Sequence, residues 1–128
     1  MKEMIKSGTK GSQGEILLSQ IKKLITDRNG IVKICTLVIL SGYSARYINY
    51  LFEMYSGISA KQFCNSVRME CVINEFYNNP DVSFSCIARK FHFYDQAHFV
   101  HEFKKSTGKT PSQYLDEVIK SSKVPVSA

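Results

Sequence analysis

Two stretches of the chain place arginine, asparagine, glutamine and histidine at helical spacing, a pattern suited to hydrogen bonding with the edges of DNA bases. In the first stretch the expected inward residues are Ile48, Leu51, Phe52 and Tyr55, and the expected outward residues are Ala45, Arg46, Asn49 and Tyr50. In the second stretch the expected inward residues are Phe99 and Phe103, and the expected outward residues are Gln96, Ala97, Val100 and His101. Arginine can bind guanine O6 and N7 with two hydrogen bonds, and asparagine or glutamine can bind adenine N6 and N7 in the same way. Two such faces on a basic, helical chain favour sequence-specific binding of double-stranded DNA over two ordinary solvated surfaces.

The second outward face is less polar than the first, because Ala97 and Val100 offer no hydrogen bond. It therefore reads bases weakly, through contact with thymine methyl groups, or serves mainly as an anchor on the DNA.

The two stretches belong to an internal repeat. A constant shift aligns Ile48 with Phe99, Phe52 with Phe103, Gly57 with Gly108, Ser59 with Thr110 and Gln62 with Gln113. A duplicated unit of this length indicates two copies of one supersecondary element.

The elements that carry these faces are all expected to be helices. The chain has 128 residues, 44% of them hydrophobic, and the sequence predicts an all-α protein with about seven helices and no strand. Capping residues are expected at Ser12, Ser59, Ser83 and Asp95. A short helix is expected over 33–40, and a third helix is expected to start near Ser44. Thr110-Pro111 is expected to open the last helix, which is expected to end near Ile119.

Each copy has the form of a helix-turn-helix, in which a short helix is followed by a tight turn and a second helix. Gly42 supplies the positive φ that the first turn favours. His92 stands at the second turn, and histidine is one of the few other residues enriched at positive φ, so this turn is expected to form with some strain.

We expect the organisation to be a flexible lead-in over 1–12, a first helix-turn-helix subdomain over 13–57, a linker helix over 58–78, a second subdomain over 79–119 and a flexible tail over 120–128. A straight helix of about 19 residues spans roughly 28 Å, of the same order as the ~34 Å between successive turns of one groove. A monomer could therefore read an asymmetric, continuous site.

The net charge of +6, from 17 Lys and Arg against 11 Asp and Glu, favours a polyanionic partner. The candidate phosphate contacts are the side chains of Lys33, Lys61, Lys104, Lys105 and Lys109. The helix N-termini near Ser83 and Thr110 are further candidates, because they can donate backbone N–H groups. No apolar run is long enough to span a membrane, and no signal peptide is visible, so a cytoplasmic location is expected.

No cofactor, metal site or enzymatic activity is expected. Cys35, Cys64, Cys71 and Cys86 show no C-x2-C pairing and are expected to be reduced, buried core residues. His98 and His101 stand three apart on one helix, but no further ligands are positioned with them, and His98 is expected to lean toward the core. No nucleophile elbow, phosphate loop or pair of catalytic acids is recognisable.

The sequence resembles the AraC/XylS family of bacterial transcription regulators from about Glu15 to Leu115. The motifs that carry the resemblance are the stretch from Phe99 to Tyr114, which ends in T-P-S-Q-Y, the segment Ser41-Gly42-Tyr43-Ser44 with Leu51-Phe52, Arg68 on the long helix, and Ile87-Ala88. The chain departs from the family pattern at Val38, His92 and Leu115.

The resemblance implies two helix-turn-helix subdomains, homeodomain-like in form, bridged by the long helix. It also implies that the helices Ser44–Tyr55 and Asp95–Ser106 enter adjacent major grooves. The implied role is in transcription, most often activation through RNA polymerase, at the nucleoid in the bacterial cytoplasm. Many relatives carry a separate sensing or dimerisation domain, so the chain is either a complete small regulator or the C-terminal half of a longer one.

The alternative function is a helical protein-interaction module with little direct DNA readout. Cys35, Ile39 and Leu40 make the second helix more apolar than a surface role requires. Packing of this patch on the first helix is the preferred interpretation, and a partner or dimer contact is the other.

Overall fold

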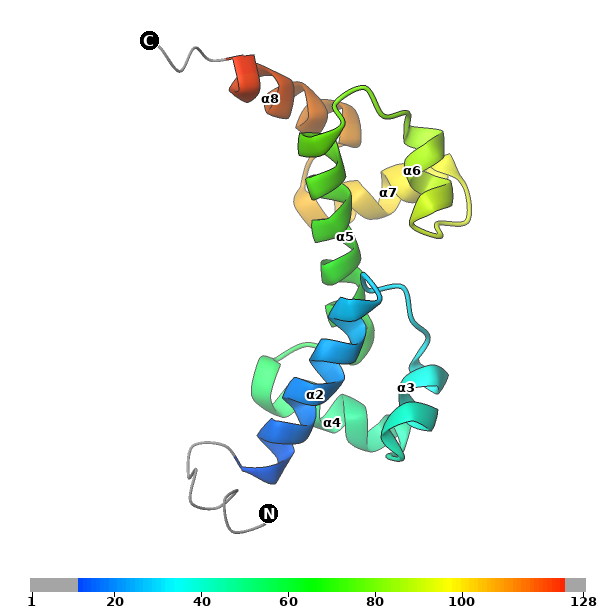
Figure 1. Ribbon diagram of the computed structural model, residues 1–128, viewed down its shortest axis with the longest axis vertical. Helices are drawn as coiled ribbons and strands as arrows, with labels where there is room; N and C mark the ends of the chain where they lie inside the picture. The colour runs from blue at the N-terminus through cyan, green and yellow to red at the C-terminus, as the bar shows by residue number, and fades with distance from the viewer. Residues whose placement is uncertain (1–11, 124–128) are drawn as a thin grey trace. The chain divides into compact units, whose positions relative to one another are not determined.

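The computed structural model describes residues 12–123, and within this range every secondary-structure element is a helix (Figure 1). The seven helices of this range are α2 (Gln13–Asp27), α3 (Ile34–Ser41), α4 (Ala45–Ser56), α5 (Ala60–Asn78), α6 (Phe84–Lys90), α7 (Gln96–Thr107) and α8 (Pro111–Lys123). The all-α prediction with about seven helices is confirmed. The lead-in expected over 1–12 lies almost wholly outside the described residues, as does 124–128 of the expected tail.

The chain divides into two compact units between Val67 and Arg68, within α5. The first unit contains α2, α3, α4 and the start of α5, and the second contains the rest of α5 with α6, α7 and α8. Each unit therefore holds one copy of the repeat, and each is described below by itself.

The first unit packs α4 against both α2 and α3 (Figure 1). On α2, α3 and α4 its buried side chains are Leu18, Ile21, Ile25, Leu37, Ile48, Leu51 and Phe52. A Cβ atom at Gly14 would stand 3.2 Å from Leu51 Cδ2, so glycine permits the close crossing of α2 and α4. Tyr55, which was expected to point into the core, is 40% exposed, and its hydroxyl lies 3.0 Å from Ser12 Oγ at the start of α2.

The second unit is built around aromatic rings. Phe76 of α5 lies with its ring centroid 5.6 Å from that of Phe103, which in turn lies 5.7 Å from Phe99. Phe84, Phe93 and Tyr114 extend this cluster to α6, to the turn before α7 and to α8. Because α6 and α7 share this core, their relative placement is fixed by large side chains that fit in few ways.

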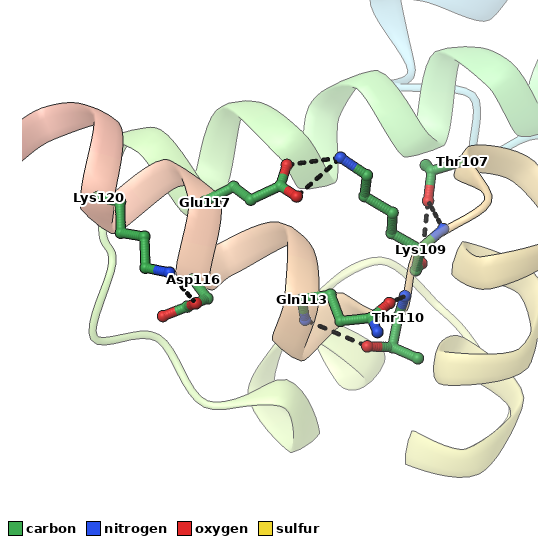
Figure 2. Close-up of polar contacts among 7 residues, drawn as sticks. All are labelled: Thr107, Lys109, Thr110, Gln113, Asp116, Glu117 and Lys120. Atoms are coloured by element: carbon green, nitrogen blue, oxygen red, sulfur yellow. Dashed lines mark hydrogen bonds and ion pairs between the residues drawn. The ribbon is translucent and has the colours of Figure 1, made fainter.

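The capping residues act as the sequence predicts. The Ser12 hydroxyl accepts a hydrogen bond from the Glu15 N–H at 3.1 Å, and the Glu15 carboxylate accepts one from the Ser12 N–H, which completes a capping box. The corresponding ends of the two repeat copies are also capped alike. Gln62 and Ser59 exchange hydrogen bonds at the start of α5, as do Gln113 and Thr110 at the start of α8 (Figure 2).

The helix ends differ from the prediction at two places. The last helix continues to Lys123 rather than ending near Ile119. The short second helix begins at Ile34, with Lys33 as its N-cap. The buried residues of α5 are Ala60, Cys64, Val67, Met69, Val72 and Phe76, whereas Phe63 and Cys71 are only half-buried.

The prediction that all four cysteines are buried holds only for Cys64. Cys35 and Cys86 are exposed, Cys71 is half-buried and Cys64 is buried. The prediction that the apolar patch of the second helix packs on the first helix is also wrong, because Ile39 is 77% and Leu40 is 49% exposed. The reason is the same in both cases. Short helices such as α3 and α6 turn only one narrow stripe inward, and Leu37 and Ile87 already fill it.

Candidate nucleic-acid interface

The first helix-turn-helix consists of α3, a turn and α4. Gly42 ends α3 with φ +80°, and its N–H donates to the Val38 carbonyl at 2.9 Å. The Ser41 hydroxyl accepts from the Tyr43 N–H, and the Ser44 hydroxyl accepts from the Tyr47 N–H, each at 3.1 Å. The turn and the start of α4 are thus held by local hydrogen bonds, which set the direction in which α4 leaves.

The outward face of α4 is centred on Arg46 and Tyr50. Ile48, Leu51 and Phe52 are fully or almost fully buried on the opposite face. Arg46 is exposed, Tyr50 is 52% exposed, and Ala45 is half-buried at the first helical position. A guanidinium group beside a phenol at this place can donate hydrogen bonds to a base edge or to phosphate oxygens.

Asn49 has a structural role that the sequence analysis missed. Its side-chain Oδ1 accepts a hydrogen bond from the Ala60 N–H at 2.9 Å, and its side chain is half-buried. This contact satisfies one of the N–H groups left unpaired at the start of α5. This contact turns the amide oxygen of Asn49 toward the start of α5 rather than outward. The expectation that it points outward as a base contact is therefore corrected.

A row of exposed tyrosines beside Arg46 was also missed. The ring centroids of Tyr43 and Tyr47 lie 5.4 Å apart, and those of Tyr47 and Tyr50 lie 6.0 Å apart. All three rings are exposed, and Met54 continues the row along α4. The spacing of four, three and four residues could have revealed this stripe, because it places the side chains on one side of a helix.

The second helix-turn-helix is built from α6, a turn and α7. His92 stands at the turn with φ +61°, as the sequence analysis expected for this position. The Phe93 N–H donates to the Ala88 carbonyl at 2.8 Å, which closes the turn over the end of α6. Arg68 of α5 donates from Nη1 to the carbonyls of Phe91 at 3.2 Å and His92 at 3.3 Å. Its guanidinium also lies 4.1 Å from the centre of the Phe93 ring.

The start of α7 is capped by a reciprocal pair of side chains. Asp95 Oδ1 accepts from the His98 N–H at 2.7 Å, and His98 Nδ1 accepts from the Tyr94 N–H at 3.1 Å. His98 is half-buried and lies against the Phe93 ring rather than deep in the core. No cluster of three potential metal ligands occurs among residues 12–123.

The outward face of α7 carries the second set of predicted base contacts. Gln96, Ala97 and His101 are exposed, and Val100 is half-buried. An open surface depression of about 750 Å³ runs along this face, lined by Gln96, Ala97, Val100, His101, Lys104 and Lys105. The structure thus brings all four predicted residues of this helix together with two of the predicted phosphate contacts.

The predicted phosphate contacts fall into two groups. Lys33, Lys61, Lys104 and Lys105 are exposed, whereas the hydroxyls of Ser83 and Thr110 already accept cap hydrogen bonds from Cys86 and Gln113. Lys109 is bound by the Glu117 carboxylate of α8, at 2.6 and 2.8 Å (Figure 2). A phosphate would have to compete with that carboxylate for the ammonium group.

A helix-turn-helix motif that occurs twice in one chain is typical of a known family. A family model described as a helix-turn-helix domain matches residues 39–117, which covers the end of α3 through most of α8. The chain belongs to the AraC-type helix-turn-helix family.

A solved structure supports the fold assignment. The C-terminal domain of AraT, a response regulator from Geobacillus stearothermophilus, is similar with a TM-score of 0.74 and 19% identity. The similarity covers 83% of this chain and 88% of the AraT chain. No curated protein matches the sequence.

Membership in the AraC-type family makes this chain a DNA-binding transcription regulator. Its partner is double-stranded DNA. None of the helices within residues 12–123 has the length and apolar character that crossing a membrane requires.

Proposed function

We propose that this AraC-type chain reads an asymmetric DNA site as a monomer, with α4 and α7 in adjacent major grooves. The observation that carries the proposal is the orientation of Arg46. It is exposed on α4 opposite a face whose buried residues, Ile48 and Phe52, fix the rotation of the helix. The proposed base contacts of α4 are Arg46 and Tyr50, with Ala45 packing at the groove edge.

Phosphate anchoring is assigned to the exposed lysines. Lys33 and Lys61 would anchor the first unit, and Lys104 and Lys105 would anchor the second. Four phosphate contacts would give a slope of about −3.6 in log affinity against log salt concentration. A slope near zero would contradict an electrostatic anchor.

The test begins by selecting bound sequences from a random DNA pool and measuring affinity for the best site. Arg46→Ala is expected to cost about 1–3 kcal/mol and to relax the preference at one base pair, because a bidentate arginine–guanine contact has this strength. Arg28→Ala is the matched control, since Arg28 is also exposed and its loss removes the same charge from the end of α2. Equal effects of the two variants would mean that Arg46 makes no base contact.

The arrangement on DNA is tested by footprinting on the selected site. Two protected major-groove segments about 10–10.5 base pairs apart on one side of the duplex, without a palindrome, are the expected result. One protected segment would mean that only one helix reads the DNA.

The regulatory direction that we propose is activation through RNA polymerase, in the cytoplasm of a bacterium. A reporter gene placed downstream of the selected site should rise in expression when the protein is produced. A fall in expression at the same site would show that the chain is a repressor.

A protein-interaction role is the second candidate, and one observation favours it. Ile39 and Leu40 of α3 are exposed apolar side chains on a helix that buries only Leu37. Gel-shift titration with random DNA at two salt concentrations separates the two functions. Absence of binding at both concentrations would favour the interaction module.

A further inference from the structure

The outward face of α7 has an apolar centre between two polar ends. Ala97 and Val100 occupy the centre with the exposed His101 beside them, Gln96 begins the helix, and Lys104 and Lys105 lie in its last turn. Residues three and four apart on a helix lie on one face, which is why these side chains line one continuous depression. The side chains of Ala97 and Val100 therefore offer the bases no hydrogen-bond donor or acceptor.

An apolar centre discriminates among bases because only one of the four standard bases presents an apolar group in the major groove. Thymine carries the C5-methyl group, whereas cytosine presents an amino donor and the purines present N7 with a second polar group. A polar base edge pressed against Val100 would lose its water without gaining a hydrogen bond, which is unfavourable. A methyl group at the same place would instead be removed from water together with the valine side chain.

Gln96 reinforces the same choice. It is exposed at the first position of α7, where a side chain reaches furthest into a groove that the helix enters by its N-terminus. The side-chain amide of glutamine can bind N6 and N7 of adenine with two hydrogen bonds. Adenine is the base paired with thymine, so the amide and the apolar centre both favour A·T pairs.

We propose that α7 selects A·T pairs, with Ala97 and Val100 contacting a pyrimidine C5-methyl group and Gln96 binding adenine. Lys104 and Lys105 hold the neighbouring phosphates and add affinity without sequence preference. This inference rests on the proposed DNA-reading function. It gives the site an asymmetric composition, with guanine opposite Arg46 of α4 and thymine opposite α7.

The experiment removes the methyl group from the DNA and leaves the protein intact. In the selected site, each thymine under α7 is replaced by deoxyuridine, which differs only by the C5-methyl group. Burial of one methyl group corresponds to about a fourfold change in affinity, so the contacted thymine should show a loss of about two- to fourfold. Deoxyuridine substitutions at thymines that flank the two protected segments are the matched control and are expected to change affinity less.

A double-mutant cycle assigns the effect to the side chain. In Val100→Ala, replacing thymine by deoxyuridine should change the affinity little or not at all. Lys105→Ala should weaken binding to the thymine-containing and the deoxyuridine-containing DNA equally, and should lower the salt slope by about 1. Replacing the contacted thymine by 5-methylcytosine should retain more affinity than cytosine does, since it restores the methyl group. This arm separates recognition of the methyl group from recognition of thymine as a whole.

The possible failures are distinguishable. If the protein binds its selected site but thymine and deoxyuridine DNA bind equally at every position under α7, the methyl inference is wrong and the proposed function stands. If Val100→Ala leaves the deoxyuridine effect unchanged, the assignment to that side chain is wrong. If no sequence is enriched from the random pool, the proposed function itself fails.

Discussion

The turn of the second helix-turn-helix offers a direct test of backbone strain. His92 adopts φ +61°, whereas Gly42 at the corresponding turn of the first unit adopts φ +80°. A non-glycine residue in the left-handed region costs roughly 1–2 kcal/mol. Glycine, in turn, loses roughly 0.5–1 kcal/mol more backbone entropy on folding. The difference predicts that His92→Gly stabilises the second unit by about 0.5–1 kcal/mol.

The reciprocal substitution provides the matched control. Apart from the adjoining residues, nothing lies within 4 Å of the place where a Cβ at Gly42 would stand, so the Cβ of Gly42→His meets no steric clash and the substitution tests the effect of φ. It is expected to destabilise the first unit by about the same 0.5–1 kcal/mol. Glycine and histidine thus exchange places between two turns of the same design.

Urea unfolding followed by circular dichroism measures both effects. With a slope of about 1 kcal/mol per molar urea for so small a unit, the midpoint should rise by roughly 0.5–1 M in His92→Gly and fall similarly in Gly42→His. The slope itself should stay unchanged. A lower midpoint for His92→Gly would refute the strain argument, and would mean that the histidine ring makes contacts worth more than the backbone cost.

Three further predictions concern the same framework. Arg68→Gln should destabilise the second unit by about 2–4 kcal/mol, because it removes charged hydrogen bonds to the carbonyls of Phe91 and His92 and the contact with the Phe93 ring. A urea unfolding midpoint equal to that of the parent protein would contradict this prediction. Burial, with a smaller contribution from the neighbouring Glu70, raises the pKa of the Cys71 thiol. At neutral pH a thiol reagent should therefore modify the exposed Cys86 well before Cys71, as followed by mass spectrometry. Equal rates of modification at the two cysteines would contradict this prediction. Gln113→Ala should cost about 0.5–1.5 kcal/mol through loss of its hydrogen bond from the Thr110 N–H, as read from thermal unfolding, and an unchanged midpoint would show that this half of the cap adds nothing.

The local features of this protein could be predicted from its sequence because they depend on residues close together in the chain. Ser12 and Glu15, and likewise Thr110 and Gln113, are three residues apart, and their reciprocal hydrogen bonds form wherever the helix starts. The positive φ of His92 was expected because its turn aligns with the turn that contains Gly42.

The candidate site was predicted only in part. Arg46, Tyr50, Gln96, Ala97 and His101 were expected on outward faces, and all of them are exposed. Asn49 was expected there as well, but its place at the edge of that face brings it to the first N–H of the next helix. Helical periodicity predicts which side of its own helix a residue lies on. It does not predict which other segments of the folded chain contact that side.

Sequence alone determined the class of the protein, its seven described helices, their caps and the duplication that makes two helix-turn-helix motifs. Tertiary structure decided which side chains remain available to a partner. It left Ile39 exposed, engaged Asn49 with the start of α5 and paired Lys109 with Glu117. Caps and turns depend on neighbours three or four residues away, whereas burial and pairing depend on contacts between segments that only the folded chain brings together.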